Sequence, residues 1–337
     1  MGEYARSLAI AGACIEQWPQ AQLHFVLSRQ APYAAAVPFP ATLLESSPTF
    51  HSQAVIELMQ SFCPTVVIFD NAGRTAQLRA ARRRGAHVVY ISARARQRRK
   101  AFRWRWLKLI DEHWIAYPEF IAGSLNFFER LKLKLQPGVQ VRFLDVILSR
   151  GPSPPNTTPV FAPDTFLLMV PGGGTGHPRA RDAVGQFLSA ARALAAQGIA
   201  TLIVGSAEEA PAEPNFKGVA SLPQAELARL LREARLVVAN GGSTLLQAIA
   251  SGAACIGVAI ADDQAARIRQ CVQAAVAVAA PLDADAIIAT AARLWNDELA
   301  RKALAQRASE LRLADGVQVA LAGLKRLIEP AADRAVP

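Results

Sequence analysis

Short apolar runs that are typical of β-strands alternate with helix-like segments along most of this chain, and this alternation limits the folds open to it. The strand-like runs are residues 21–27, 65–70, 86–92, 112–118, 165–170, 200–205, 235–239 and 254–260. Apolar residues recur every three to four positions in segments between them, which indicates helices. These helix-like segments are residues 52–62, 75–85, 181–198, 224–234 and 243–252. Such alternation predicts an α/β fold of parallel sheets wound by right-handed crossovers.

A stretch rich in proline, serine and threonine divides this alternation into two halves. The chain has 337 residues, of which 52% are hydrophobic, so each half is large enough to bury a core. We therefore expect two doubly wound, Rossmann-like domains facing a cleft, because ligands of such sheets bind beyond the carboxyl ends of the strands. The expected parts are a first domain at 1–150, a linker at 151–164, a second domain at 165–316 and a terminal helical segment at 317–337.

The first domain departs from the doubly wound pattern at its start. Such a domain normally opens on a strand, whereas this chain begins with a loop and a helix, MGEYARSLAIAGACIEQW. We therefore expect the first strand of this domain to be missing: either it is absent from the start, or the domain is built without it.

Several absences favour a cytoplasmic protein. No apolar run approaches the length of a membrane span, and the first residues lack the pattern of a secretory signal. The four cysteines (Cys14, Cys63, Cys255 and Cys271) are scattered in apolar surroundings without CxxC spacing. This distribution predicts buried, reduced thiols and argues against a zinc site or a disulfide framework.

The net charge of +10 comes from one region. Residues 71–110 contain 13 basic and no acidic side chains, so the rest of the chain carries a net charge of about 10 − 13 = −3. Within this region, ARARQRRKAFRWRWLKL (93–109) mixes eight basic residues with phenylalanine and tryptophan. Basic side chains attract anionic headgroups and tryptophan favours the membrane interface, whereas a solvated helix and nucleic-acid binding are the alternatives.

No nucleic-acid-binding motif accompanies this basic segment, so we expect a membrane surface or a lipid-diphosphate acceptor and no nucleic acid. The side chains expected to contact that partner are Arg98, Arg99, Arg103, Trp104 and Trp106.

Glycine-rich turns follow two strands of the second half, PGGGTGHP at 171–178 and NGGST at 240–244. Glycines let backbone amides approach a ligand, and the N-terminus of a following helix favours an anion. Each turn is either a tight strand-to-helix connection or an anion site, and Ser243 or Thr244 is also suited to capping the helix. Two such turns in one sheet favour phosphate recognition.

Polar residues beyond these turns extend the predicted site. Gln247 lies one helical turn after Thr244, where it is suited to binding a ribose hydroxyl. The triplet DDQ at 262–264 is expected to end the next strand, so that Asp263 and Gln264 bind sugar hydroxyls. In the first half, Asp70 ends a strand in FDNAG, where it binds an acceptor, assists a base or only initiates a turn.

The segment GGSTLLQAIASGAACIGVAIADDQ resembles the donor-binding segment of GT-B glycosyltransferases. The nearest members are the peptidoglycan N-acetylglucosaminyltransferase and the UDP-sugar hydrolase of pseudaminic acid synthesis. The resemblance implies a diphosphate site, a ribose contact and a sugar site, formed respectively by Gly242, Ser243 and Thr244, by Gln247, and by Asp263 and Gln264. GGGTG at 172–176 resembles the family's glycine loop and so places Gly173, Gly174 and Thr175 at the donor. The resemblance also implies that the terminal helix crosses back to the first domain.

Two positions depart from the family pattern. Gln247 stands where glutamate is usual, which weakens the grip on the ribose or changes the preferred nucleotide. Glu3, in GEYAR, stands where the family has a histidine that resembles the hydrolase's catalytic group, so its absence argues against simple hydrolysis. A glutamate in the cleft is suited to act as general base on an acceptor hydroxyl, and a frayed, solvated residue is the alternative.

The sequence thus predicts a glycosyltransferase that needs no metal and no cofactor, since helix N-termini and backbone amides offset the charge of the leaving diphosphate. It would move a sugar from a nucleoside diphosphate, UDP foremost, to an envelope polysaccharide or lipid-linked acceptor at the cytoplasmic membrane face. Its catalytic carboxylate is expected to be Glu3 or Asp70. A nucleotide-sugar hydrolase and a non-catalytic basic interaction protein with a degenerate pocket remain the alternatives.

Overall fold

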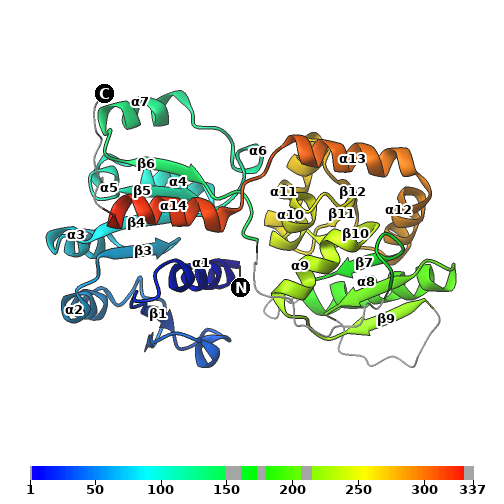
Figure 1. Ribbon diagram of the computed structural model, residues 1–337, viewed down its shortest axis with the longest axis horizontal. Coiled ribbons are helices and arrows are strands. Elements are labelled where there is room, and N and C mark those ends of the chain that lie inside the picture. The colour runs from blue at the N-terminus through cyan, green and yellow to red at the C-terminus, as the bar shows by residue number, and fades with distance from the viewer. Residues whose placement is uncertain (1, 149–160, 173–178, 206–214, 330–337) are drawn as a thin grey trace. The chain divides into compact units, whose positions relative to one another are not determined.

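The computed structural model describes residues 2–148, 161–172, 179–205 and 215–329 (Figure 1). The chain forms two compact units. One is Val146–Leu313, and the other combines Glu3–Asp145 with Ala314–Pro337. None of the described helices combines the length and the apolar composition needed to cross a membrane.

The unit Val146–Leu313 is built on a six-stranded parallel sheet with the order β12-β11-β10-β7-β8-β9. Its strands are β7 (Leu167–Val170), β8 (Thr201–Val204), β9 (Phe216–Val219), β10 (Leu236–Asn240), β11 (Cys255–Val258) and β12 (Val278–Ala280). The chain winds from β7 to β9 in one direction and then returns to place β10 on the other side of β7. The winding therefore reverses between β7 and β10, and this reversal defines the ligand-binding point of a doubly wound sheet.

The helices of this unit connect its strands, and several of them form one apolar core with the sheet. They are α8 (Arg179–Ala196), α9 (Gln224–Glu233), α10 (Ser243–Ala250), α11 (Asp262–Gln273), α12 (Ala284–Asn296) and α13 (Glu298–Glu310). Strands β7, β8, β10 and β11 are buried along their whole length. Unbroken apolar runs such as LLMV and TLIV are what parallel strands covered on both faces require.

The other unit holds a four-stranded parallel sheet, β3-β4-β5-β6, and a separate parallel pair, β1-β2. Its strands are β1 (Phe25–Ser28), β2 (Ala41–Leu44), β3 (Val66–Asp70), β4 (His87–Ser92), β5 (Glu112–Ile115) and β6 (Gln140–Phe143). Its helices are α1 (Gly2–Gln17), the short η1 (Ala34–Ala36), α2 (Ser52–Phe62), α3 (Thr75–Arg83), α4 (Ala95–Ala101), α5 (Trp104–Leu107), α6 (Glu119–Ala122), α7 (Phe127–Leu135) and α14 (Gly316–Ile328). Helix α1 begins at the first described residue, and the missing first strand stays a prediction.

Helix α14, from the end of the chain, packs on β6 of this unit (Figure 1). The carboxylate of Glu112 on β5 is fully buried and pairs with Arg142 and with Arg326 of α14, each at 2.8 Å. Gly323 brings the helix close to Trp114, since a Cβ there would lie 3.1 Å from the indole ring. A buried carboxylate with two guanidinium partners fixes the helix in place, because a buried charge must be paired.

The structure corrects two predictions. The triplet DDQ does not end a strand: β11 ends at Val258, and Asp262–Gln264 form the first turn of α11. Acidic residues are favoured there by the positive end of the helix dipole. Among the cysteines, Cys63 is exposed at the left-handed end of α2, whereas Cys14, Cys255 and Cys271 are buried as expected.

Candidate functional site

One buried side chain, Asn240 at the end of β10, joins the carboxyl ends of β7 and β10. Its amide nitrogen donates a hydrogen bond of 2.8 Å to the carbonyl of Pro171, which follows β7. Its amide oxygen accepts one of 2.8 Å from the backbone N–H of Gly242. Since the winding of the sheet reverses between these strands, Asn240 holds together the two turns that border the expected ligand crevice.

Close packing explains the glycines around Asn240. Gly172 has φ +87°, and a Cβ at this residue would lie 1.9 Å from the Asn240 amide nitrogen. A Cβ at Gly242 would lie 2.6 Å from the amide oxygen, and one at Gly241 would lie 2.8 Å from Cβ of Gln264 on α11. A side chain at Gly172 or Gly242 would displace the amide that joins the turns, and one at Gly241 would displace α11. The sequence singled out the glycines but missed Asn240, although it opens the NGGST motif.

Helix α10 begins without a side-chain cap. Its N-cap residue is Gly242, and Ser243 is its first helical residue, so the predicted alternative of capping by a Ser243 or Thr244 hydroxyl is wrong. The first N–H groups of a helix have no intrahelical partner, and the helix dipole makes this end positive. Ser243 is exposed and Thr244 is half-buried. These amides and hydroxyls together form a group of donors suited to an anion.

Gln247, the predicted ribose contact, lies one turn further along α10 and is half-buried. Its side-chain nitrogen donates a hydrogen bond of 2.8 Å to the carbonyl of Ile147, at the start of the same compact unit. This contact ties α10 to the segment that enters the unit. The ribose role remains a prediction.

Helix α11, which follows the next strand β11, packs against the glycine turn after β10. The Gln264 side-chain oxygen accepts a hydrogen bond of 3.0 Å from the N–H of Ile260, two residues before the helix begins. This bond ties the first turn of α11 to the segment that leads into it. The carboxylate of Asp263 is 75% exposed and lies 3.4 Å from Arg267. Arg267 also donates to the carbonyl of Gly241 and so brings a positive charge to the turn. Sequence reasoning missed Arg267, although its spacing of four residues from Asp263 was a usable signal.

The other glycine turn is only partly described. Gly173, Gly174 and Thr175, predicted donor contacts, lie outside the described residues. Their roles remain predictions.

A second polar cluster lies in the other unit, where α1 meets the carboxyl end of β3. The Arg6 guanidinium donates to both carboxylate oxygens of Asp70, at 2.6 and 3.0 Å. Burial raises the pKa of Asp70, and the adjacent guanidinium opposes this by favouring the ionised form. The pairing commits both oxygens of Asp70 to holding α1 on the sheet.

Glu3 lies beside this ion pair and keeps an exposed carboxylate. One of its oxygens accepts a hydrogen bond of 2.7 Å from the side-chain nitrogen of Asn71. Asn71 has φ +54°, and its side-chain oxygen accepts a 2.7 Å bond from the N–H of Ala93, after β4. An oriented, exposed carboxylate at the ends of two strands has the placement that a general base needs.

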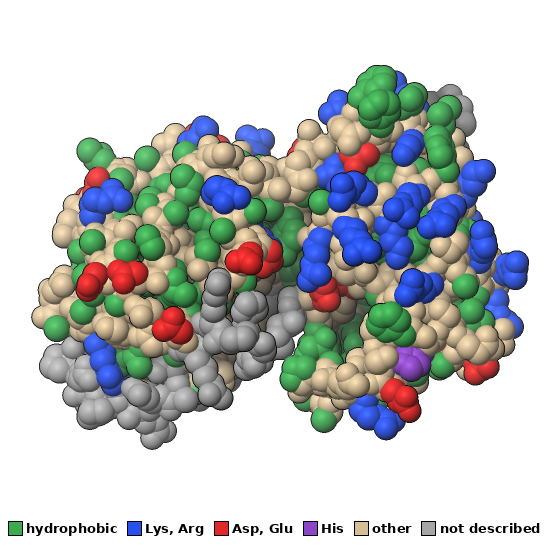
Figure 2. Space-filling view, turned by 180° about the vertical axis from the view of Figure 1, so that it is seen from behind, with side chains coloured by type: hydrophobic (Ala, Val, Ile, Leu, Met, Phe, Trp, Pro, Cys, Tyr) green, Lys and Arg blue, Asp and Glu red, His purple; other side chains and the backbone are tan. Residues whose placement is uncertain are grey.

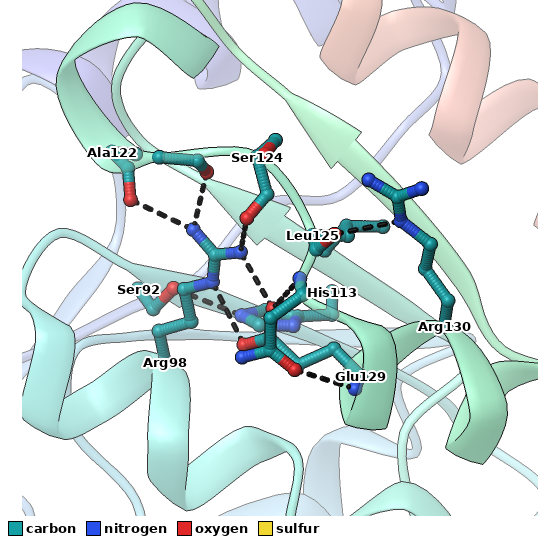
Figure 3. A network of polar contacts seen from close by, with 10 residues as sticks. Ser92, Arg98, His113, Ala122, Ser124, Leu125, Glu129 and Arg130 are labelled. Carbon is teal, nitrogen blue, oxygen red and sulfur yellow. Dashed lines mark hydrogen bonds and ion pairs between the residues drawn. The ribbon is translucent and has the colours of Figure 1, made fainter.

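Part of the basic segment forms an internal network (Figure 3). The Arg98 guanidinium binds the Glu129 carboxylate of α7 through two hydrogen bonds of 3.0 and 2.7 Å. It also donates to three backbone carbonyls, those of Ala122, Gly123 and Ser124. The predicted surface role of Arg98 is therefore wrong, because these acceptors draw its charge inward.

Trp106 is also wrongly predicted as a surface residue. It is fully buried, its indole N–H donates a 3.1 Å bond to the Thr75 hydroxyl, and its ring meets Tyr90 edge-on. Arg99 and Arg103 are exposed, and Trp104 is 43% exposed, so these three side chains remain accessible to a partner.

His113 is a packed residue of the same region (Figure 3). It is fully buried, and its Nε2 lies 2.9 Å from the Ser92 hydroxyl. Burial, with a smaller effect of Arg98, lowers the pKa of His113 to about 3. The ring is neutral at physiological pH. Among the described residues no group of three or more His, Cys, Asp or Glu side chains is arranged to hold a metal ion.

Comparison with known proteins identifies the fold. No protein-family model and no curated protein matches the sequence. Among solved structures, the spinosyn forosaminyltransferase SpnP is similar with a TM-score of 0.69 and 12% identity over 98% of this chain and 97% of that one. MurG of Acinetobacter baumannii follows with a TM-score of 0.61 and 16% identity, over 96% of each chain.

A UDP-N-acetylglucosamine 2-epimerase is also similar, with a TM-score of 0.58 and 13% identity over 96% of this chain and 92% of that one. Such likeness at low identity establishes architecture and leaves activity to be argued from the site. Two parallel α/β units, of which Val146–Leu313 is doubly wound, and the near-complete coverage of these neighbours mean that the chain has the GT-B fold.

Proposed function

We propose that this chain is a glycosyltransferase that moves a sugar from a nucleoside diphosphate, UDP foremost, to a lipid-linked or glycan acceptor of the cell envelope at the cytoplasmic membrane face. One observation carries the proposal. The uncapped N-terminus of α10 follows the glycine turn that Asn240 joins to the end of β7, at the reversal point of the sheet. That arrangement presents backbone donors and a positive dipole to a diphosphate.

The donor roles follow from this placement. Backbone amides at Ser243 and Thr244, in the first turn of α10, would bind the diphosphate together with the hydroxyls of the same two residues and stabilise its charge as the sugar leaves. Arg267 adds a positive charge beside the turn. Gln247 is proposed to contact the ribose, and the exposed Asp263 with Gln264 the sugar.

The other unit supplies the group that activates the acceptor. We assign Glu3 as general base, because its carboxylate is exposed and Asn71 orients it, whereas the oxygens of Asp70 are occupied by Arg6. A carboxylate in this position takes the proton of an acceptor hydroxyl as that hydroxyl attacks the sugar carbon. The exposed arginines Arg99 and Arg103 support an anionic, lipid-linked acceptor.

Nucleotide binding is tested by thermal melting with UDP, GDP, dTDP and CMP. A ligand at about 100 times its Kd adds about 2.7 kcal/mol to the free energy of unfolding, which raises Tm by several degrees. The variant Ser243→Ala/Thr244→Ala should lose most of this shift. Ser251→Ala, at the other end of α10, is the matched control and should keep it. No shift with any nucleotide at millimolar concentration would overturn the proposal.

Product analysis separates transfer from the related reactions. Incubation of the donor with and without membrane extract should release nucleotide only when an acceptor is present. Free sugar formed without acceptor would instead indicate the hydrolase, and an epimerised donor would indicate the reaction for which one structural neighbour is named.

A further inference from the structure

Helix α7 of the unit Glu3–Asp145 exposes large apolar side chains along one face. Phe127 and Phe128 are 74% and 70% exposed, and Leu131 and Leu135 are also exposed. At 3.6 residues per turn these four positions lie within about 100° of the helix circumference. Isolated exposed apolar residues are ordinary, but four on one helical face form a patch that requires an explanation.

The helix that carries this patch is firmly held. Asn126 caps it by accepting a 2.9 Å bond from the N–H of Glu129, and the Glu129 carboxylate accepts a 3.0 Å bond from the N–H of Asn126. Glu129 is buried and pairs with Arg98 of α4 (Figure 3). The opposite face of α7 is therefore fixed to the unit, and the outward direction of the apolar face follows from that attachment.

Trp104 of α5 extends the patch, and cations surround it. The amino group of Lys132 on α7 lies 6.0 Å from the centre of the half-exposed Trp104 ring, which connects the two helices at the surface. The exposed basic residues of these segments are Arg99, Arg103, Arg105, Lys108, Arg130 and Lys134. Figure 2 shows Lys and Arg side chains gathered over one side of this unit, with hydrophobic side chains among them.

The charges of the segments 93–110 and 120–135 are almost all positive. Residues 120–135 contain a single acidic residue, Glu129, which is buried and neutralised by Arg98. Residues 93–110 contain none. A cationic rim around an apolar helical face with a tryptophan is the composition of helices that lie in the headgroup region of a bilayer.

We propose that α7 and Trp104 insert into the interface of an anionic lipid bilayer while the surrounding lysines and arginines bind its headgroups. The inference rests on the membrane location in the proposed function and names the segment responsible. It replaces Arg98 and Trp106, which face inward, with Phe127, Phe128, Leu131 and Leu135 as the side chains that enter the lipid. The cationic rim selects an anionic partner, and the tryptophan beside an apolar helical face favours a bilayer as that partner.

The test is co-sedimentation of the full chain with vesicles of phosphatidylcholine alone or mixed with phosphatidylglycerol. The wild-type chain should bind only the mixed vesicles, and added salt should weaken this binding because it screens the headgroup attraction. Phe127→Ser/Phe128→Ser should reduce the bound fraction at least about tenfold. Leu299→Ser, which removes another highly exposed apolar side chain on α13, is the matched control and should bind like the wild type.

Equal binding of the wild type and the double variant would overturn the inference, as would no binding to the mixed vesicles. A wild-type dimer that the double variant converts to a monomer, without vesicle binding, would assign the face to self-association and also overturn it. The nucleotide-induced Tm shift, measured on the same samples, separates the two proposals. A retained shift without vesicle binding rejects the membrane surface alone, and vesicle binding without any shift rejects the transferase alone.

Discussion

The two compact units present polar groups at the carboxyl ends of their strands by different means. In Val146–Leu313, glycine turns close around Asn240 and leave backbone amides at the start of α10. In the other unit, charged side chains take this place: Arg6 pairs with Asp70, and Glu3 remains exposed beside them. Amides suit a ligand that brings its own negative charge, whereas a carboxylate suits removal of a proton. The contrast supports assigning the donor to one unit and the base to the other.

The two sheets also differ in how deeply they bury the strand that leads to each polar cluster. Strand β10 lies between β7 and β11 and is buried throughout. Strand β3 is at the edge of its four-stranded sheet, and Phe69 is its only buried residue. Packing therefore holds the first site, whereas the second depends strongly on the ion pair that attaches α1. Substitutions that disturb the packing around Asn240, or that remove the Arg6–Asp70 ion pair, should show which of the two holds each site.

The largest expected effect is that of Arg6→Met, which leaves the largely buried Asp70 carboxylate without its guanidinium partner. Removing one member of a buried pair costs about 3–5 kcal/mol in the free energy of unfolding. Burial already raises the pKa of Asp70, and loss of the guanidinium raises it further, so the folded variant takes up a proton more readily than the unfolded chain. The cost should be greatest above that raised pKa and should shrink as pH falls through it.

Chemical unfolding from pH 8 down to pH 4, about the ordinary pKa of an aspartate, measures this dependence. The double variant Arg6→Met/Asp70→Asn should recover much of the loss, since no buried charge remains. A cost for Arg6→Met below about 1 kcal/mol would show that packing, and not the ion pair, holds α1, as for an exposed pair.

Gly172→Ala should have the next largest effect. Its new Cβ would collide with the Asn240 amide at a residue with φ +87°, which costs about 2–4 kcal/mol and separates the two turns. Gly252→Ala is the matched control, because Gly252 has φ +81° but open space around it, so only the backbone strain of about 1 kcal/mol applies. Thermal melting gives the stabilities, and the nucleotide-induced shift should be lost in Gly172→Ala alone. Equal stabilities and equal nucleotide-induced shifts for the two variants would show that the Asn240 amide does not hold the two turns together.

The sequence predicted the parts of the fold that depend on local pattern. Helix 52–62 is α2 with the same bounds, and the end of β3 at Asp70 was also predicted. The alternation of elements predicted parallel sheets, which both units have. Strands β9 and β12 were missed, because lysine and glycine interrupt the apolar run of β9 and the three residues of β12 are too few to show a strand pattern.

What the sequence missed depends on distant partners. Arg98 looked like part of a basic surface, but Glu129, 31 residues later, draws it inward. Asn240 looked like a turn residue, but its amide bonds to Pro171, 69 residues earlier. The exposed face of α7 was also not predicted. Its apolar residues have the spacing of a helix packed in a core, so the sequence alone does not show that this face is exposed. Such pairings arise from tertiary structure and leave no local signal.

The smallest effect on stability, and a large one on rate, is expected for Glu3→Gln. Glu3 is exposed, so its loss should change the free energy of unfolding by less than about 0.5 kcal/mol. Sugar transfer should fall at least about 100-fold, because a general base contributes that much, while nucleotide binding stays unchanged. Glu16→Gln, exposed near the other end of α1, is the matched control. Full transfer activity in Glu3→Gln would show that Glu3 is not the general base.

Hydrogen–deuterium exchange in the presence of saturating UDP tests the central claim most directly, because it reports on the backbone amides assigned to the diphosphate. Binding of the diphosphate at this helix end should slow exchange in the peptide that spans the turn after β10 and the first turn of α10, Gly242 to Leu245. Peptides from the other end of α10 should change little. Saturation with UDP without any change of exchange in Gly242 to Leu245 would contradict the assignment of the diphosphate to this helix end.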